Sequence, residues 1–270
     1  MPALVSLSSR TSTVRAVHEP PRLSEQPEIY TLTLSRPEKR NALSPDLLSE
    51  LKDALTTLGK LEKPVPVIIT GTGAAFCAGA DLKAMAAMTA DQARIYTDGL
   101  RDLIFSLHDS PHIFIAAVNG FAVGGGCELM MNCDYSIVSD QASFGFPELQ
   151  FGLMPGATGT AALASLVGPV RAKRMLLDGE FISADEALHI GLVSKVVPHD
   201  DLLVKAEAFA GTFDARSIAA ASRMKSVVET ALIRGTKEAY AAESEAFREC
   251  FRSGDTAQAI SSYLTQKKRG

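Results

Sequence analysis

Two short apolar runs, residues 65–70 and 113–118, most constrain the fold of this chain. Proline or glycine bounds each run, and each is shorter than a typical helix. Continuous apolar runs of this length are typical of strands that are buried on both faces, as in parallel sheets. The two runs therefore predict strands of a buried sheet.

Helix and strand signals alternate around these two runs. Further strands are predicted from β-forming or apolar segments at 13–17, 28–35, 135–139 and 193–197. Helices are predicted from apolar periodicity and capping residues at 44–59, 91–108, 124–133 and 183–186. Alternation of this kind over the first two thirds of the chain predicts the α/β class.

The last part of the chain carries only helical signals. Helical spacing extends over 225–266, broken at Gly235 and restarted after Gly254 with Asp255 as a cap. We therefore predict a core domain over residues 1–199 and a helical C-terminal region over 200–270.

Charge and hydropathy exclude several classes of partner. The chain of 270 residues carries 27 basic and 31 acidic side chains, giving a net charge of −4. This balance creates no basic field for nucleic acid or an anionic membrane. Since no apolar run approaches the roughly 20 residues that cross a bilayer, we expect neither a nucleic-acid partner nor a membrane association.

The four cysteines lack C-x-x-C spacing and are too few for a disulfide framework, which predicts a reducing, cytoplasmic location. Residues 1–18 contain Arg10 and Arg15 but no acid, which is also typical of an organelle transit peptide, so that alternative stays open. His108 and His112 are separated by Pro111, which breaks any helix that would align them. We therefore predict no metal site.

Two glycine-rich loops each follow a predicted buried strand. The first spans residues 75–82, and the second, 118–126, ends in three glycines and opens a helix. Small residues expose backbone N–H groups at such places, and the first N–H groups of a helix lack partners. The two loops predict a backbone oxyanion hole. The glycine spacings of dinucleotide and P-loop motifs are absent, so we expect no NAD or ATP.

Two glutamates stand beside this glycine-rich backbone, Glu128 in the predicted helix 124–133 and Glu148 after Pro147. Alone, each would be interpreted as a surface carboxylate or a cap. The apolar residues that flank Glu148 should raise its pKa, as a general acid requires. Since G-x-S-x-G and H-E-x-x-H are absent, the pattern indicates acid–base chemistry without a metal.

Several segments match one known family in its own order. They are Arg36-Pro37 with Asn41-Ala42-Leu43, and residues 76–82, 116–134, 144–159 and 177–197. On these segments the chain resembles the crotonase family, also called the enoyl-CoA hydratase/isomerase superfamily, and is most similar to its enoyl-CoA hydratases.

The resemblance implies a fold, an assembly and a ligand. The expected fold is a spiral of ββα turns followed by a helical region that mediates trimerisation, with trimers that often pair into hexamers. The expected ligand is an acyl-CoA thioester, and no further cofactor is implied because CoA is part of the substrate. The family pattern maps the two oxyanion-hole N–H groups onto Ala80 and Gly125.

The resemblance also implies a reaction, because hydratases of the family keep glutamates at both positions. Glu128 and Glu148 would hold one water, near the N–H of Gly156, and add it in the syn sense to a 2-enoyl-CoA. Glu128 would chiefly activate the water, and Glu148 would chiefly protonate Cα. Alternatives are an enoyl-CoA isomerase, a dienoyl-CoA hydratase, an acyl-CoA hydrolase or a catalytically silent binding protein.

For the CoA moiety, the resemblance implies Lys83 near the phosphates and the backbones of Ala42 and Ala78 at the adenine. Tyr263 would contribute from a neighbouring subunit. The chain departs from the hydratase pattern at 158–162, where the family often has an arginine. We expect Met85, Met88, Phe121, Phe146 and Phe151 to shape the acyl pocket, with core filling as the open alternative for the two methionines.

Overall fold

The computed structural model describes residues 14–19, 28–213, 215–252, 256, 260–261 and 264–265. Its larger sheet has six strands in the order β1-β2-β3-β5-β7-β10. These strands are β1 (Val14–Glu19), β2 (Ile29–Leu34), β3 (Pro66–Gly71), β5 (Ile113–Val118), β7 (Tyr135–Ser139) and β10 (Lys195–Val197). All neighbours pair in parallel except β1 with β2.

A smaller sheet has the order β4-β6-β8-β9. Its strands are β4 (Ala75–Cys77), β6 (Phe121–Val123), β8 (Ser143–Gly145) and β9 (Ile182–Ser183). The pairs β3–β4, β5–β6 and β7–β8 each place one strand in each sheet before the chain enters a helix. This repeated turn confirms the predicted spiral of ββα units.

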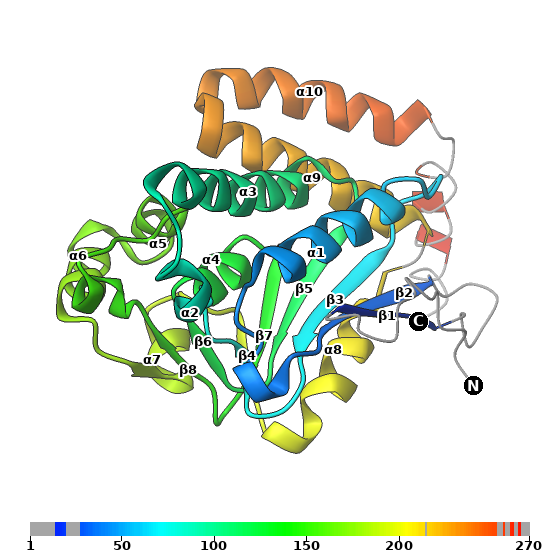
Figure 1. Ribbon diagram of the computed structural model, residues 1–270. Helices are drawn as coiled ribbons and strands as arrows, with labels where there is room; N and C mark the ends of the chain where they lie inside the picture. The colour runs from blue at the N-terminus through cyan, green and yellow to red at the C-terminus, as the bar shows by residue number, and fades with distance from the viewer. Residues whose placement is uncertain are drawn as a thin grey trace.

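Ten α-helices pack around and beside the sheets in the described residues (Figure 1). They are α1 (Pro45–Leu58), α2 (Leu82–Met85), α3 (Ala90–Asp109), α4 (Gly125–Met131), α5 (Gly159–Val167), α6 (Pro169–Asp178), α7 (Ala184–His189), α8 (Leu202–Ala210), α9 (Ala215–Arg234) and α10 (Thr236–Arg252). Helices α9 and α10 form a hairpin beside α3.

Strand β3 shows why the apolar runs have no alternation. Val67 and Ile69 join the main core, which also contains residues of α1, α3 and α4. Ile68 points to the opposite face and packs in a second cluster with Leu202 and Ala206 of α8. Since successive side chains of a strand point to opposite faces, a sheet that is covered on both sides needs an unbroken apolar run.

Local signals placed several elements correctly. The predicted strands at 113–118 and 135–139 coincide with β5 and β7, and α1 begins after Ser44, whose hydroxyl accepts from Leu47 N at 3.2 Å. Gly235 separates α9 from α10 with φ +96°, as its predicted break requires. Helix α9 begins at Ala215, ten residues before the predicted start, and β4 and β6 lie where we expected only loops. Gly254 and Asp255 lie outside the described residues.

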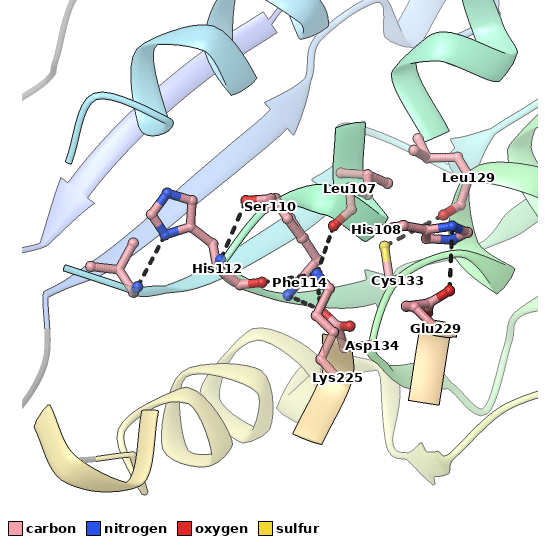
Figure 2. A network of polar contacts seen from close by, with 11 residues as sticks. Leu107, His108, Ser110, His112, Phe114, Leu129, Cys133, Asp134, Lys225 and Glu229 are labelled. Atoms are coloured by element: carbon pink, nitrogen blue, oxygen red, sulfur yellow. Dashed lines mark hydrogen bonds and ion pairs between the residues drawn. The ribbon is translucent and has the colours of Figure 1, made fainter. Parts of the chain in front are cut away.

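One lysine attaches α9 to the rest of the molecule (Figure 2). The Lys225 ammonium donates to the carbonyls of Leu107 and His112 and pairs with Asp134 Oδ2 at 3.0 Å. It also lies 4.9 Å from the Phe114 ring centroid. Because only 5% of this side chain is exposed, its three donors must be satisfied by protein groups.

The two histidines of the sequence analysis have structural roles in the same region. His112 joins two segments, with Nδ1 accepting from Val65 N at 3.1 Å and Nε2 lying 2.9 Å from Leu58 O. His108 Nδ1 lies 3.5 Å from Glu229 Oε2 of α9 (Figure 2). The part of the chain that the structure describes contains no cluster of metal-ligating side chains.

The predicted division between a core domain and a helical C-terminal region at residue 199 stays a prediction. Helix α8 follows residue 199 and covers one face of the larger sheet. Among the described helices, none is both long and apolar enough to cross a bilayer.

Candidate active site

The first glycine-rich loop pairs with Leu43 through its backbone, and the N–H of Ala80 takes no part in this pairing. Leu43 N donates to Gly79 O at 2.7 Å, and Asp81 N donates to Leu43 O at 3.2 Å. Since neighbouring residues of an extended segment point their backbone groups to opposite sides, the N–H of Ala80 faces away from Leu43. Asp81 caps α2 through Oδ1 and pairs with Arg36 at 3.3 Å, which fixes the loop.

The second loop lies directly against the first. A Cβ added to Gly79 would meet Val123 O at 2.6 Å and Gly125 N at 3.3 Å. Gly79 has φ +80° and Gly124 has φ +50°, conformations that glycine adopts without strain. Gly125 is the first residue of α4, so its N–H has no acceptor within the helix. The two loops thus bring Ala80 and Gly125 to one place.

Glu128 lies one turn into α4 and is only 2% exposed. Its Oε1 accepts three backbone N–H groups at the start of α5: Ala157 at 3.0 Å, Thr158 at 2.9 Å and Gly159 at 2.7 Å. These bonds stabilise a buried negative charge. They also occupy Oε1 and leave Oε2 for other contacts.

Glu148 comes from a 3₁₀ helix, Pro147–Phe151, on the other side of the cavity. Its Oε2 is buried and has no hydrogen-bond partner in the described structure. Burial raises the pKa of Glu148, and the nearby Glu128 carboxylate raises it further. The close approach of Glu148 depends on Gly124, where an added Cβ would lie within contact distance of Oε1.

One cavity of about 300 Å³ joins these groups. It is lined by all five predicted catalytic residues, Ala80, Gly125, Glu128, Glu148 and Gly156, and by Ala78. The two glutamates and the two loop residues therefore surround one space. Such a space can polarise a carbonyl and transfer protons next to it.

The other predicted ligand-binding residues lie apart from this cavity or outside the described residues. Ala42 is not among its lining residues, and its carbonyl accepts from Arg36 Nη1 at 2.7 Å. Lys83 is exposed on α2, directly after the first loop. Tyr263 lies outside the described residues.

The wall beyond the carboxylates is mostly apolar. Of the predicted pocket residues, Met85 and Phe151 line the cavity, whereas Met88, Phe121 and Phe146 do not. Phe146 lies in the buried core, and Phe121 is exposed beneath the Arg40 guanidinium. The remaining apolar lining residues include Leu82, Leu100, Leu153 and Met154.

Helix α3 contributes a wall that the sequence analysis missed. Tyr96 donates its hydroxyl to Leu43 O at 2.8 Å, and burial raises its pKa. Thr97 turns its hydroxyl back to the carbonyls of its own helix and presents its methyl group toward Gly156. Arg94 lines the cavity and pairs with Asp98 at 3.1 Å. In the sequence, these residues show only the periodicity of an amphipathic helix.

Comparisons with known proteins show the family to which the chain belongs. The sequence model of the enoyl-CoA hydratase/isomerase family matches residues 24–269. A crotonyl-CoA hydratase of Syntrophomonas wolfei is 38% identical over 91% of this chain and 95% of its own length. A 2,3-dehydroadipyl-CoA hydratase of Escherichia coli K12 is 36% identical over the same shares of the two chains. The crystal structure of an enoyl-CoA hydratase from Bacillus anthracis superposes with a TM-score of 0.85 at 32% identity, covering 94% of this chain and 97% of the other.

Proposed function

The chain belongs to the enoyl-CoA hydratase/isomerase family and is an enoyl-CoA hydratase; we propose that it adds water in the syn sense to a 2-enoyl-CoA. One observation carries the proposed mechanism. A buried Glu128, held by three N–H groups, and a Glu148 with an unpartnered oxygen line the cavity that also contains Ala80 and Gly125.

In this mechanism the thioester carbonyl oxygen accepts the N–H groups of Ala80 and Gly125. These donors stabilise the negative charge that develops on the oxygen when the enolate forms. Attack of water at Cβ creates this negative charge, which is shared between Cα and the carbonyl oxygen. The oxyanion hole therefore lowers the barrier to the attack. No bound cofactor is needed, since CoA belongs to the substrate.

The two glutamates divide the proton transfers. Glu128 Oε2 accepts a proton from the water as the water oxygen bonds to Cβ. Glu148 acts as the acid and gives a proton to Cα on the same face, a role that its raised pKa favours. The product carries one water more than the substrate, and a proton transfer between the two carboxyls restores the starting state. Gly156 lines the cavity, and its N–H would bind the same water.

The test is mass spectrometry of crotonyl-CoA incubated with the purified protein. We expect a product heavier by one water, and we expect Glu128→Gln and Glu148→Gln each to abolish it. Glu38→Gln, at an exposed position of the 3₁₀ helix Pro37–Lys39, is the matched control and should keep full activity. Near-normal turnover by either active-site variant would overturn the mechanism. A product of unchanged mass would indicate isomerisation instead.

Binding of the CoA moiety is a separate part of the proposal. Lys83 follows the first loop closely and is exposed, which suits a contact with the nucleotide phosphates. Ala42 and Ala78 would contact the adenine through their backbones, and Tyr263 would approach from a neighbouring subunit. Lys83→Ala should raise the KM for crotonyl-CoA and leave kcat unchanged. An unchanged KM would remove Lys83 from the site.

We further propose a cytoplasmic trimer or dimer of trimers. Helices α9 and α10 expose large apolar side chains, among them Met224, Val228, Leu232, Tyr240 and Phe247. Apolar groups gathered on one helical hairpin are typical of an interface. Light scattering coupled to size-exclusion chromatography should give a mass of three or six chains, and a monomer would contradict the assembly.

A further inference from the structure

The side chain of Asn132 connects both ends of the Glu128 site. Asn132 ends α4, and its Nδ2 donates to the Glu128 carbonyl at 2.6 Å and to Thr158 Oγ1 at 2.8 Å. Thr158 in turn donates its N–H to Glu128 Oε1 at 2.9 Å. The three residues therefore form a closed ring of hydrogen bonds that holds the backbone and the carboxylate of Glu128 together.

Thr158 does not use its hydroxyl in the usual way for its position. It is the N-cap residue of α5, where a threonine side chain ordinarily accepts an N–H of its own helix. Here the side chain makes no such bond, and Oγ1 accepts from Asn132 instead. The free N–H groups at the start of α5 are directed to Glu128 Oε1.

The close approach of α5 to Glu128 leaves little tolerance for movement. A Cβ added to Gly159 would lie 2.9 Å from Glu128 Oε1 and 2.7 Å from the Pro155 Cβ. At this separation a small shift of α5 would break the hydrogen bonds to Oε1. The carboxylate could then rotate, and Oε2 would lose its fixed position.

We propose that Asn132 and Thr158 are positioning residues that clamp the start of α5 onto Glu128. The clamp determines that Oε1 is occupied and that Oε2 is the oxygen presented to the reacting water. This inference rests on the proposed hydration by Glu128. It predicts that the pair affects the rate of the chemical step and leaves acyl-CoA binding unchanged, because neither side chain lines the cavity.

The kinetic test compares Thr158→Val with Thr158→Ser on crotonyl-CoA. Valine keeps the shape and the N–H of Thr158 but cannot accept from Asn132, so kcat should fall between about tenfold and a hundredfold, as for small misplacements of catalytic groups. KM should stay within about twofold. Serine keeps the acceptor and should retain at least about a third of the wild-type kcat. A Thr158→Val kcat within about twofold of wild type, or a change confined to KM, would overturn the clamp.

A double variant and hydrogen exchange complete the test. Asn132→Ala removes the same bond, so Asn132→Ala with Thr158→Val should lower kcat little further than the larger single effect. Fully multiplicative losses would contradict a shared clamp. Amide exchange at residues 157–159 should be faster in Thr158→Val than in wild type and unchanged in Thr158→Ser. Unaltered exchange in Thr158→Val would overturn the clamp, whether or not the wild type hydrates crotonyl-CoA. Failure of the wild type to hydrate crotonyl-CoA would refute the proposed function separately.

Discussion

Replacing Lys225 by methionine tests how the C-terminal hairpin is attached to the core. Methionine keeps an unbranched apolar stem but removes the ammonium. The change leaves two backbone carbonyls and Asp134 Oδ2 without their lysine donor (Figure 2). It also removes the cation from the face of Phe114.

The expected cost follows from the surroundings of the pair. Breaking a buried ion pair by removing one partner costs about 3–5 kcal/mol, because the remaining charge stays shielded from water. The Asp134 side chain is 16% exposed and keeps its bond from Phe114 N at 2.7 Å, so it is partly compensated. We therefore expect a loss of about 3 kcal/mol in the free energy of unfolding, which lowers Tm by roughly 6–12 °C for a chain of this size.

Urea unfolding at one fixed protein concentration measures this loss, since the stability of an oligomer depends on concentration. Lys52→Met is the matched control, because Lys52 forms an exposed pair with Asp102 at 3.7 Å and should change stability by less than about 0.5 kcal/mol. Lys225→Met combined with Asp134→Asn should lose less than the sum of the single losses. A loss below about 1 kcal/mol in Lys225→Met, or an equal loss in Lys52→Met, would refute the reasoning.

Three further predictions concern the cavity and the loops around it. The raised pKa of Glu148 favours its protonated form in the folded state, so that stability is present at low pH and lost as pH rises through the folded pKa. Glu148→Gln should therefore raise Tm relative to wild type more at about pH 8 than at about pH 5, and thermal unfolding with the opposite order would contradict this. The apolar wall should favour trans-2-hexenoyl-CoA over 2,3-dehydroadipyl-CoA by at least about tenfold in kcat/KM. The second substrate ends in a carboxylate, and Arg94 is already paired with Asp98. Equal kcat/KM values would refute the preference. Gly126→Ala would place a Cβ against the backbone carbonyl of Cys77 and should cost about 2 kcal/mol or more in urea unfolding. Gly99→Ala should cost nothing, because the added Cβ would meet only Lys52 Nζ, at an ordinary contact distance of 3.8 Å.

The sequence determined the features that depend on neighbouring residues in the chain. The two short apolar runs predicted β3 and β5, and Ser44 with Pro45 predicted the start of α1. The glycine loops and the two glutamates were found because their spacing and flanking residues are local signals. The exact positions Ala80, Gly125 and Gly156 came from the resemblance to the crotonase family, and together with Glu128 and Glu148 they line one cavity.

The tertiary structure decided every feature that depends on contacts between distant segments. Strands β4 and β6 have three residues each, too few for a periodic signal, and exist because they pair with each other. Lysine is ordinarily a surface residue. The burial of Lys225 is favourable only because the carbonyls of Leu107 and His112 and the carboxylate of Asp134 accept its hydrogen bonds. The ring of Glu128, Asn132 and Thr158 joins residues about 30 positions apart, and its hydrogen bonds form only after the sheets bring α4 and α5 together. Sequence patterns report which elements form, whereas the partners of buried polar groups depend on how those elements pack.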